Sequence, residues 1–182
     1  SEYWDYIKEN KLTNITGVPF SYELMLKLRF TRMDLPYLTT LAEGGGKLND
    51  KIFRTLAEYA RDNGKRFVAT FGTTETSARM AMLDPELALD KIGSIGKAIP
   101  EGRLFLTDEK GNEIDTPNTE GELTYSGPNV TMGSAIRKED LLKEDEFCGT
   151  YHTGDIAIKD EDGFFYVVGR KSRFIKLLGY RV

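Results

Sequence analysis

The apolar residues of this 182-residue chain change their spacing near Ile92. Before that point, one segment repeats apolar residues at intervals of three and four, which is the period of a helix with one buried face. Asn63-Gly64 follows this segment and predicts the end of the helix, because both residues tolerate the left-handed backbone conformation. The apolar face consists of Leu48, Ile52, Phe53, Leu56, Ala57 and Ala60.

The segments around this helix predict an α/β layer. The strand Leu38–Leu41 runs into Gly44-Gly45-Gly46, and the strand Arg66–Phe71 runs into the loop Gly72–Ser77. Strand, glycine turn, helix, strand and loop in this order are typical of an α/β sheet with a site at the carboxyl ends of its strands. Two further helices are predicted over Glu2–Asn10 and Ser21–Leu28.

Beyond Ile92, short apolar runs alternate with turn residues, which predicts a mostly β structure. The runs Asp155–Lys159 and Phe164–Val168 flank the turn-forming residues 160–163 and predict a hairpin. Arg103–Thr107 and Glu122–Ser126 are two more expected strands, so a small β-barrel or meander is expected. We therefore predict an α/β protein with a partial α/β subdomain (1–91), a β-barrel-like subdomain (92–168) and a terminal segment (169–182).

Composition limits which partners and which cellular location the sequence predicts. A net charge of -4 gives no reason to expect nucleic acid, and no apolar run approaches the roughly 18 residues that cross a bilayer. Nothing at the start resembles a signal peptide. The single Cys148 has no partner for an internal disulfide, which fits a reducing cytoplasm. Cys148 and His152 together make a poor metal site, because structural zinc takes four such ligands.

Three segments concentrate glycine, hydroxyl and charged side chains, as phosphate and ribose sites do. In the first, Phe71 to Thr76, Gly72 allows close approach of a ligand, Thr73 and Thr74 offer hydroxyls to phosphate, and Glu75 offers a magnesium ligand. A helix N-cap explains the same residues. In the second, Tyr151 to Asp155, the aspartate suits either two ribose hydroxyls or an ordinary turn. The third, Gly169 to Arg181, is equally compatible with a solvated and an anion-binding basic strand.

Taken in order, these segments resemble successive motifs of the adenylate-forming (AMP-binding) superfamily, and bacterial acyl-CoA synthetases in particular. The family's aromatic-Gly-x-Thr-Glu loop matches Phe71 to Glu75, and its Tyr-x-Thr-Gly-Asp motif matches Tyr151 to Asp155. Its Gly-Glu-Leu strand matches Gly121-Glu122-Leu123, and its Gly-Arg-x-x-x-x-Ile-Lys-x-x-Gly-x-Arg-Val motif matches Gly169 to Val182. Order and spacing agree from about Gly44 to the end.

The resemblance implies roles for individual residues. Gly44, Gly45 and Gly46 would pack against adenine, and Phe71 would stack on it, although the family usually has tyrosine there. Thr74 would contact the α-phosphate and Glu75 would bind magnesium. The remaining implied roles are ribose binding by Asp155, sugar or phosphate contact by Arg170, the interdomain hinge at Ser172 and assistance of the second half-reaction by Lys176.

The same resemblance implies an ATP-dependent ligase that forms an acyl-adenylate and then a thioester with coenzyme A. A carboxylic acid, ATP and coenzyme A would be its substrates, with magnesium as cofactor. The family's phosphate loop, Ser-Gly-Thr-Thr-Gly-x-Pro-Lys, is not found in the 182 residues. We therefore expect an internal piece of a large N-terminal domain, inactive by itself. Two alternatives remain open: an adenylation domain that loads a carrier protein, and a nucleotide-binding relative without catalysis.

Overall fold

The computed structural model describes residues 2–171, 176–177 and 180–181. The chain divides into two compact units. The first comprises Ser1–Ala69, Leu83–Gly93 and Ile175–Val182, and the second comprises Thr70–Met82 and Ser94–Phe174. One strand, β3 (Arg66–Phe71), carries the chain from the first unit into the second after Ala69.

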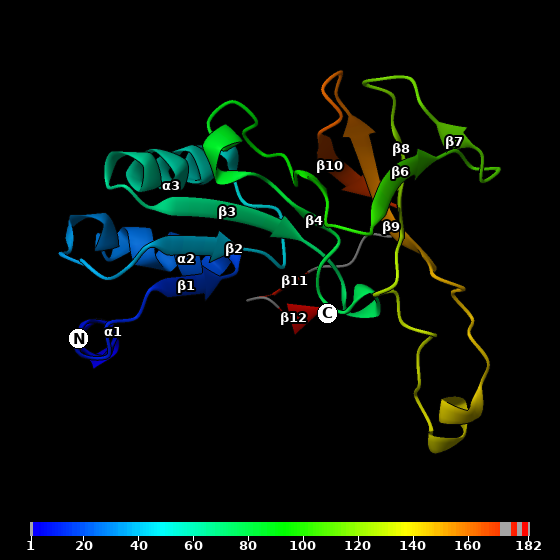
Figure 1. Ribbon diagram of the computed structural model, residues 1–182, viewed down its shortest axis with the longest axis horizontal. Helices are drawn as coiled ribbons and strands as arrows, with labels where there is room; N and C mark the ends of the chain where they lie inside the picture. Colours follow the sequence, from blue (N-terminus) through cyan, green and yellow to red (C-terminus); the bar gives the residue numbers. More distant parts are fainter. Residues whose placement is uncertain (1, 172–175, 178–179, 182) are drawn as a thin grey trace. The chain divides into compact units, whose positions relative to one another are not determined.

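The first unit is built on parallel strands. β1 (Asn14–Gly17), β2 (Thr40–Glu43) and the first four residues of β3 lie side by side in chain order (Figure 1). Every residue of β2 is buried, as expected for a central strand covered on both faces. The sequence predicted this strand two residues too early, over Leu38–Leu41, and β1 was not predicted because four residues carry too little periodicity.

The predicted amphipathic helix is confirmed as α3 (Asp50–Asp62). Its N-cap is Asn49, whose side chain accepts a hydrogen bond from the Lys51 amide at 2.9 Å. Phe53 from the buried face meets Phe67 of β3 edge to face, with ring centroids 5.0 Å apart. The apolar stripe of the sequence therefore packs where its period predicts, against the parallel strands.

Shorter elements complete the first unit. Tyr22 of α2 (Pro19–Lys27) is fully buried, and its hydroxyl lies 2.9 Å from the Ala42 carbonyl and 3.1 Å from the Ile15 carbonyl. This phenol therefore links α2 to two adjacent strands. The other elements are α1 (Glu2–Glu9), the short 3-10 helices η1 (Phe30–Arg32) and η3 (Pro85–Leu87), and the two-stranded ladder β11 (Lys176–Leu177) and β12 (Tyr180–Arg181).

The second unit is built on an antiparallel sheet with the order β10-β9-β8-β6-β7. Its buried core includes Met80, Leu106, Leu123, Tyr125 and Phe165. The strands are β6 (Arg103–Thr107), β7 (Glu113–Ile114), β8 (Gly121–Ser126), β9 (Thr150–Lys159) and β10 (Phe165–Arg170). The predicted hairpin is confirmed by β9 and β10, although β9 begins five residues before the predicted start.

Smaller elements flank this sheet. β4 (Ala81–Met82) pairs with the last two residues of β3, and β5 (Lys97–Ala98) pairs with β4. The connection from β8 to β9 leaves the sheet and carries the 3-10 helix η4 (Lys138–Leu142), as Figure 1 shows in gold. The helices and the two sheets confirm the predicted α/β class. Among the described residues no pairing joins β7 to β10, so a closed barrel stays a prediction.

Candidate active site

The loop after β3 is shaped by a helix cap and a close backbone approach. Thr73 is the N-cap of the 3-10 helix η2 (Thr74–Thr76), and the Thr76 hydroxyl donates to the Thr73 carbonyl at 3.1 Å. A Cβ on Gly72 would lie 2.1 Å from the Ala78 carbonyl oxygen, so only glycine fits there. Thr73 thus occupies the N-cap position, and η2 leaves Thr74 exposed and Glu75 half-buried.

The side chain of Asn129, which lies just after β8, holds this loop as a clamp. The Asn129 amide donates to the Thr76 carbonyl at 2.6 Å and to the Arg79 carbonyl at 2.7 Å. Its own oxygen accepts from the buried Tyr125 hydroxyl at 2.7 Å. Tyr125 has room because positions 102 and 127 are glycines. A Cβ on Gly102 or Gly127 would lie less than 3 Å from the Tyr125 ring or hydroxyl. Sequence reasoning missed the clamp, although Gly127 and Asn129 lie just after the Gly-Glu-Leu motif.

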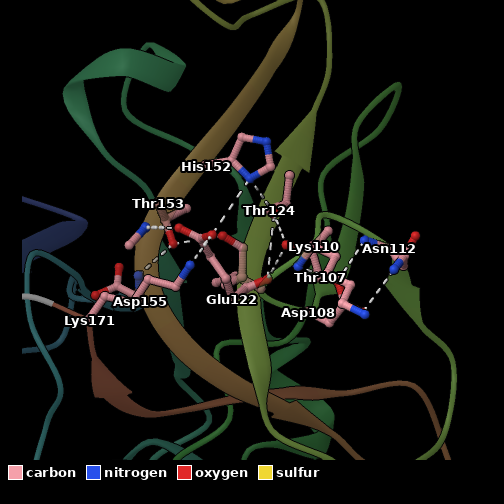
Figure 2. A network of polar contacts seen from close by, with 12 residues as sticks. Thr107, Asp108, Lys110, Asn112, Glu122, Thr124, His152, Thr153, Asp155 and Lys171 are labelled. Atoms are coloured by element: carbon pink, nitrogen blue, oxygen red, sulfur yellow. Dashed lines mark hydrogen bonds and ion pairs between the residues drawn. The ribbon is translucent and has the colours of Figure 1, made fainter.

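Asp155 and Arg170 face each other across β9 and β10. They are directly paired in the sheet register, and Arg170 Nε lies 3.3 Å from Asp155 Oδ1. The Asp155 side chain is only 11% exposed. Figure 2 shows it beside Thr153, whose hydroxyl accepts from the Asp155 amide at 3.0 Å. The second motif therefore lies in β9 beside Gly169 and Arg170, the first two residues of the third motif, in β10.

Tyr151 links the first motif to the other two. Burial raises the pKa of Tyr151, and the Glu75 carboxylate, to which its side chain is hydrogen-bonded, raises it further. Arg170 and Asp155 also act electrostatically on this phenol. Three segments that are distant in sequence therefore converge within the second unit. The sequence offered one signal for this role, since Tyr151 is the first residue of the Tyr-x-Thr-Gly-Asp motif.

The glycine segment belongs to the first unit. Gly45 has a φ of +85°, and a Cβ there would lie 3.2 Å from Val18, while one on Gly46 would lie 3.3 Å from Pro19. The prediction that Gly44–Gly46 surround the same cleft as Glu75 and Asp155 involves both units and stays a prediction. Ser172 lies outside the described residues. Lys176 begins β11, paired with Arg181, and its predicted role likewise stays a prediction.

Directly before these glycines, Glu43 ends β2 as a buried carboxylic acid. Only 4% of the residue is exposed, and burial raises its pKa to about 8. A carboxyl group that is protonated at neutral pH can donate as well as accept hydrogen bonds. Nothing in the sequence indicated this burial, because a glutamate next to three glycines looks like part of a polar loop.

The described residues offer little to a metal ion by themselves. In the part of the chain that the structure describes, no three His, Cys, Asp or Glu side chains gather as a metal cluster. His152 is exposed and lies 3.1 Å from the Thr124 hydroxyl, and Cys148 is also exposed. The predicted role of Glu75 as a magnesium ligand stays a prediction, in which bound phosphate oxygens or water would supply the other ligands. Over the same residues, no helix has the length and apolarity needed to cross a membrane.

Comparison with known proteins identifies relatives of this chain. The family of AMP-binding enzymes matches residues 1–134. The 2-succinylbenzoate–CoA ligase of Bacillus cereus (strain AH820) is 38% identical over 132 residues, which are 72% of this chain and 26% of that protein. The ligase of the same name from Geobacillus sp. (strain WCH70) is 38% identical over 122 residues, or 67% of this chain and 24% of the relative. The chain thus spans about a quarter of the length of these relatives.

Solved structures show the same fold. The O-succinylbenzoate coenzyme A synthetase (MenE) of Bacillus subtilis in complex with ATP and magnesium ion superposes with a TM-score of 0.76 at 25% identity, over 100% of this chain and 36% of that one. VinN superposes with a TM-score of 0.74 at 26% identity, over 91% of this chain and 41% of that one. Because the family model matches most of the 182 residues, and because the family's motifs occur in order, this chain belongs to the AMP-binding enzymes.

Proposed function

We propose that the protein containing this chain is an ATP-dependent acid–thiol ligase that makes an acyl-CoA thioester through an acyl-adenylate. The observation that carries the proposal is the convergence of Glu75, Asp155 and Arg170 on Tyr151 within one unit. A carboxylate, two ribose-compatible oxygens and a guanidinium are the groups that a magnesium nucleotide requires. The named relatives are CoA ligases, which favours coenzyme A as the acceptor.

In the first half-reaction, a carboxylate oxygen of the acid attacks the α-phosphorus of ATP. The new oxygen–phosphorus bond forms as the bond to pyrophosphate breaks, so acyl-adenylate and pyrophosphate result. Thr74 would donate to the α-phosphate, Asp155 would accept from the ribose hydroxyls, and Glu75 would hold the magnesium ion, which would neutralise phosphate charge. Preorganised charges and donors of this kind lower the barrier because they act on charge that develops at phosphorus.

In the second half-reaction, the thiol sulfur of coenzyme A attacks the acyl carbonyl, AMP leaves, and the thiol proton is released. We propose that Lys176 assists this step and that the chain pivots at Ser172 between the two steps. We further propose that Gly44, Gly45 and Gly46 pack against adenine, that Phe71 stacks on it, and that Gly72, Thr73 and Arg170 bind phosphate or sugar. We also propose that the antiparallel sheet belongs to a small barrel in the whole protein, and that residues 1–182 alone are inactive.

The test uses the full-length protein with ATP, magnesium and a panel of carboxylic acids that includes 2-succinylbenzoate. Acid-dependent pyrophosphate release, followed by a CoA thioester detected by mass spectrometry, is the expected result. The Glu75→Ala variant is the control and should lose pyrophosphate release. AMP binding without pyrophosphate release from any acid would instead indicate a non-catalytic nucleotide-binding relative, and transfer only to a carrier-protein thiol would indicate a carrier-loading domain.

A further inference from the structure

The strand that carries Asp155 is irregular where it passes β8. Glu122 is opposite Ile156 and Thr124 is opposite His152, so the single residue Leu123 spans the three residues between them on β9. Such a bulge removes backbone groups from the regular ladder and re-aims side chains. Gly154 lies in the bulge with a φ of +72°, a conformation that favours glycine. The orientation of Asp155 therefore depends on what holds this bulge.

Two side chains take the amides that the bulge displaces, as Figure 2 shows. Glu122 Oε1 accepts from the Gly154 amide at 3.1 Å. The Thr153 hydroxyl accepts from the Asp155 amide at 3.0 Å and donates to the Leu123 carbonyl at 2.8 Å. The amides of Gly154 and Asp155 thus both find acceptors on side chains that are buried or nearly so.

The other carboxylate oxygen of Glu122 closes a ring of contacts. Lys171 Nζ lies 2.8 Å from Glu122 Oε2, and the Lys171 amide donates to the Gly154 carbonyl at 2.8 Å. The peptide groups of Gly154 are thereby held on both sides, from β8 and from the residue that follows β10. The Glu122 side chain is 12% exposed and the Lys171 side chain is 46% exposed, so the carboxylate is the more buried partner of the two.

We infer that Glu122 is a positioning residue for Asp155: by accepting from the Gly154 amide it fixes the bulge and thereby sets the affinity for the nucleotide ribose. The inference rests on the proposed function only in the role of Asp155. Glu122 itself touches no substrate. A simple surface ion pair with Lys171 would make a different prediction, because an ion pair needs the charge of Glu122, whereas the bulge needs an acceptor oxygen at the right distance.

Two substitutions in the full-length protein separate these possibilities. Glu122→Asp keeps the charge but withdraws the carboxylate by one C–C bond, out of reach of the Gly154 amide. Glu122→Gln loses the charge but keeps an acceptor oxygen at the right distance, and the half-exposed Lys171 can turn to solvent. The exposed Glu120, which lies just before β8, supplies the matched controls Glu120→Asp and Glu120→Gln.

Calorimetric titration with AMP and the KM for ATP in pyrophosphate release are the measurements. Glu122→Asp should weaken AMP binding and raise the KM about tenfold, the factor that one lost hydrogen bond to a charged acceptor produces. Its kcat at saturating ATP should change little, because the loss is in binding. Glu122→Gln should stay within about twofold of the wild type, as should both Glu120 variants.

Impairment of Glu122→Gln with a normal Glu122→Asp would overturn the inference in favour of the ion pair. Equal impairment of both variants would overturn it too. If Glu122→Asp does not fold, Glu122→Gln carries the test alone, and a tenfold rise in its KM for ATP refutes the inference. A wild-type protein that binds AMP but releases no pyrophosphate contradicts the proposed function while the AMP titrations still decide the role of Glu122. A wild type that binds no nucleotide overturns both.

Discussion

Arg170 Nε lies 3.3 Å from Asp155 Oδ1, and the two residues are direct neighbours across β9 and β10. The pair joins the last residue of β10 to the bulged part of β9. Residues in contact affect one another, so substitutions at the two positions should not act independently. Asp155 is the more buried partner, and the Arg170 side chain is one-third exposed.

Arg170→Ala and Asp155→Ala in the full-length protein should each weaken AMP binding, and their combined effect should differ from the sum of the single effects. The expected coupling is about 0.5–3 kcal/mol, measured by calorimetric titration with AMP. Arg103 and Glu113 form an exposed ion pair between β6 and β7, so Arg103→Ala and Glu113→Ala serve as controls without effect on AMP binding. Additive effects at Arg170 and Asp155 would show that their contact does not contribute to binding.

Asn129→Ala should loosen the loop that carries Thr74 and Glu75. The substitution removes the hydrogen bonds to two loop carbonyls and leaves the Tyr125 hydroxyl without its acceptor, which together cost about 1–3 kcal/mol of stability. Hydrogen exchange should accelerate at residues 72–80. Asn112→Ala, which removes a hydrogen bond in an exposed turn, is the control and should leave exchange in that loop unchanged. Unchanged protection at residues 72–80 in Asn129→Ala would contradict the clamp.

Gly72→Ala should be among the most damaging small substitutions in the second unit. The added Cβ would lie 2.1 Å from the Ala78 carbonyl oxygen, and the backbone on both sides would have to move. A loss of more than about 3 kcal/mol is expected in chemical denaturation. Gly169→Ala is the matched control, because its Cβ would meet only the Ile156 Cβ at 3.9 Å, an ordinary contact. Equal stability of the two variants would refute the close approach at Gly72.

The stability of the first unit should fall as the pH rises from about 4.5 to about 8. Burial raises the pKa of Glu43 from 4.5 to about 8, so in this window the folded protein holds a proton that the unfolded chain releases. The free energy of unfolding therefore contains a favourable contribution at low pH that is lost as the pH passes the folded pKa. Urea unfolding followed by the fluorescence of Trp4, the only tryptophan, reports on this unit.

Glu43→Gln should lose this pH-dependent contribution, because the amide does not titrate. Glu9→Gln, at an exposed position in α1, should keep it. A wild-type protein and a Glu43→Gln variant with the same change in unfolding free energy between pH 5 and pH 8 would show that Glu43 titrates normally.

Features that depend on residues close together in the chain could be predicted from the sequence. The helix α3 follows from an apolar period and the Asn63-Gly64 stop, and the β9–β10 hairpin follows from the turn residues 160–163. The motifs also identified the family, because each is a short run with fixed spacing. Local conformational preference and side-chain periodicity are both readable from a linear chain.

Features that depend on partners distant in the chain could not be predicted, because the folded arrangement sets them. Whether Glu43 is solvated or buried, which carbonyls Asn129 reaches and how the bulge at Gly154 is held are set by strand pairing and packing. The meeting of Tyr151 with Glu75 is of the same kind, since 76 residues separate them in the chain. The sequence specifies the chemical groups of the site, and the register of β8, β9 and β10 specifies how they are aimed, because a shift of one residue turns a side chain to the other face of a sheet.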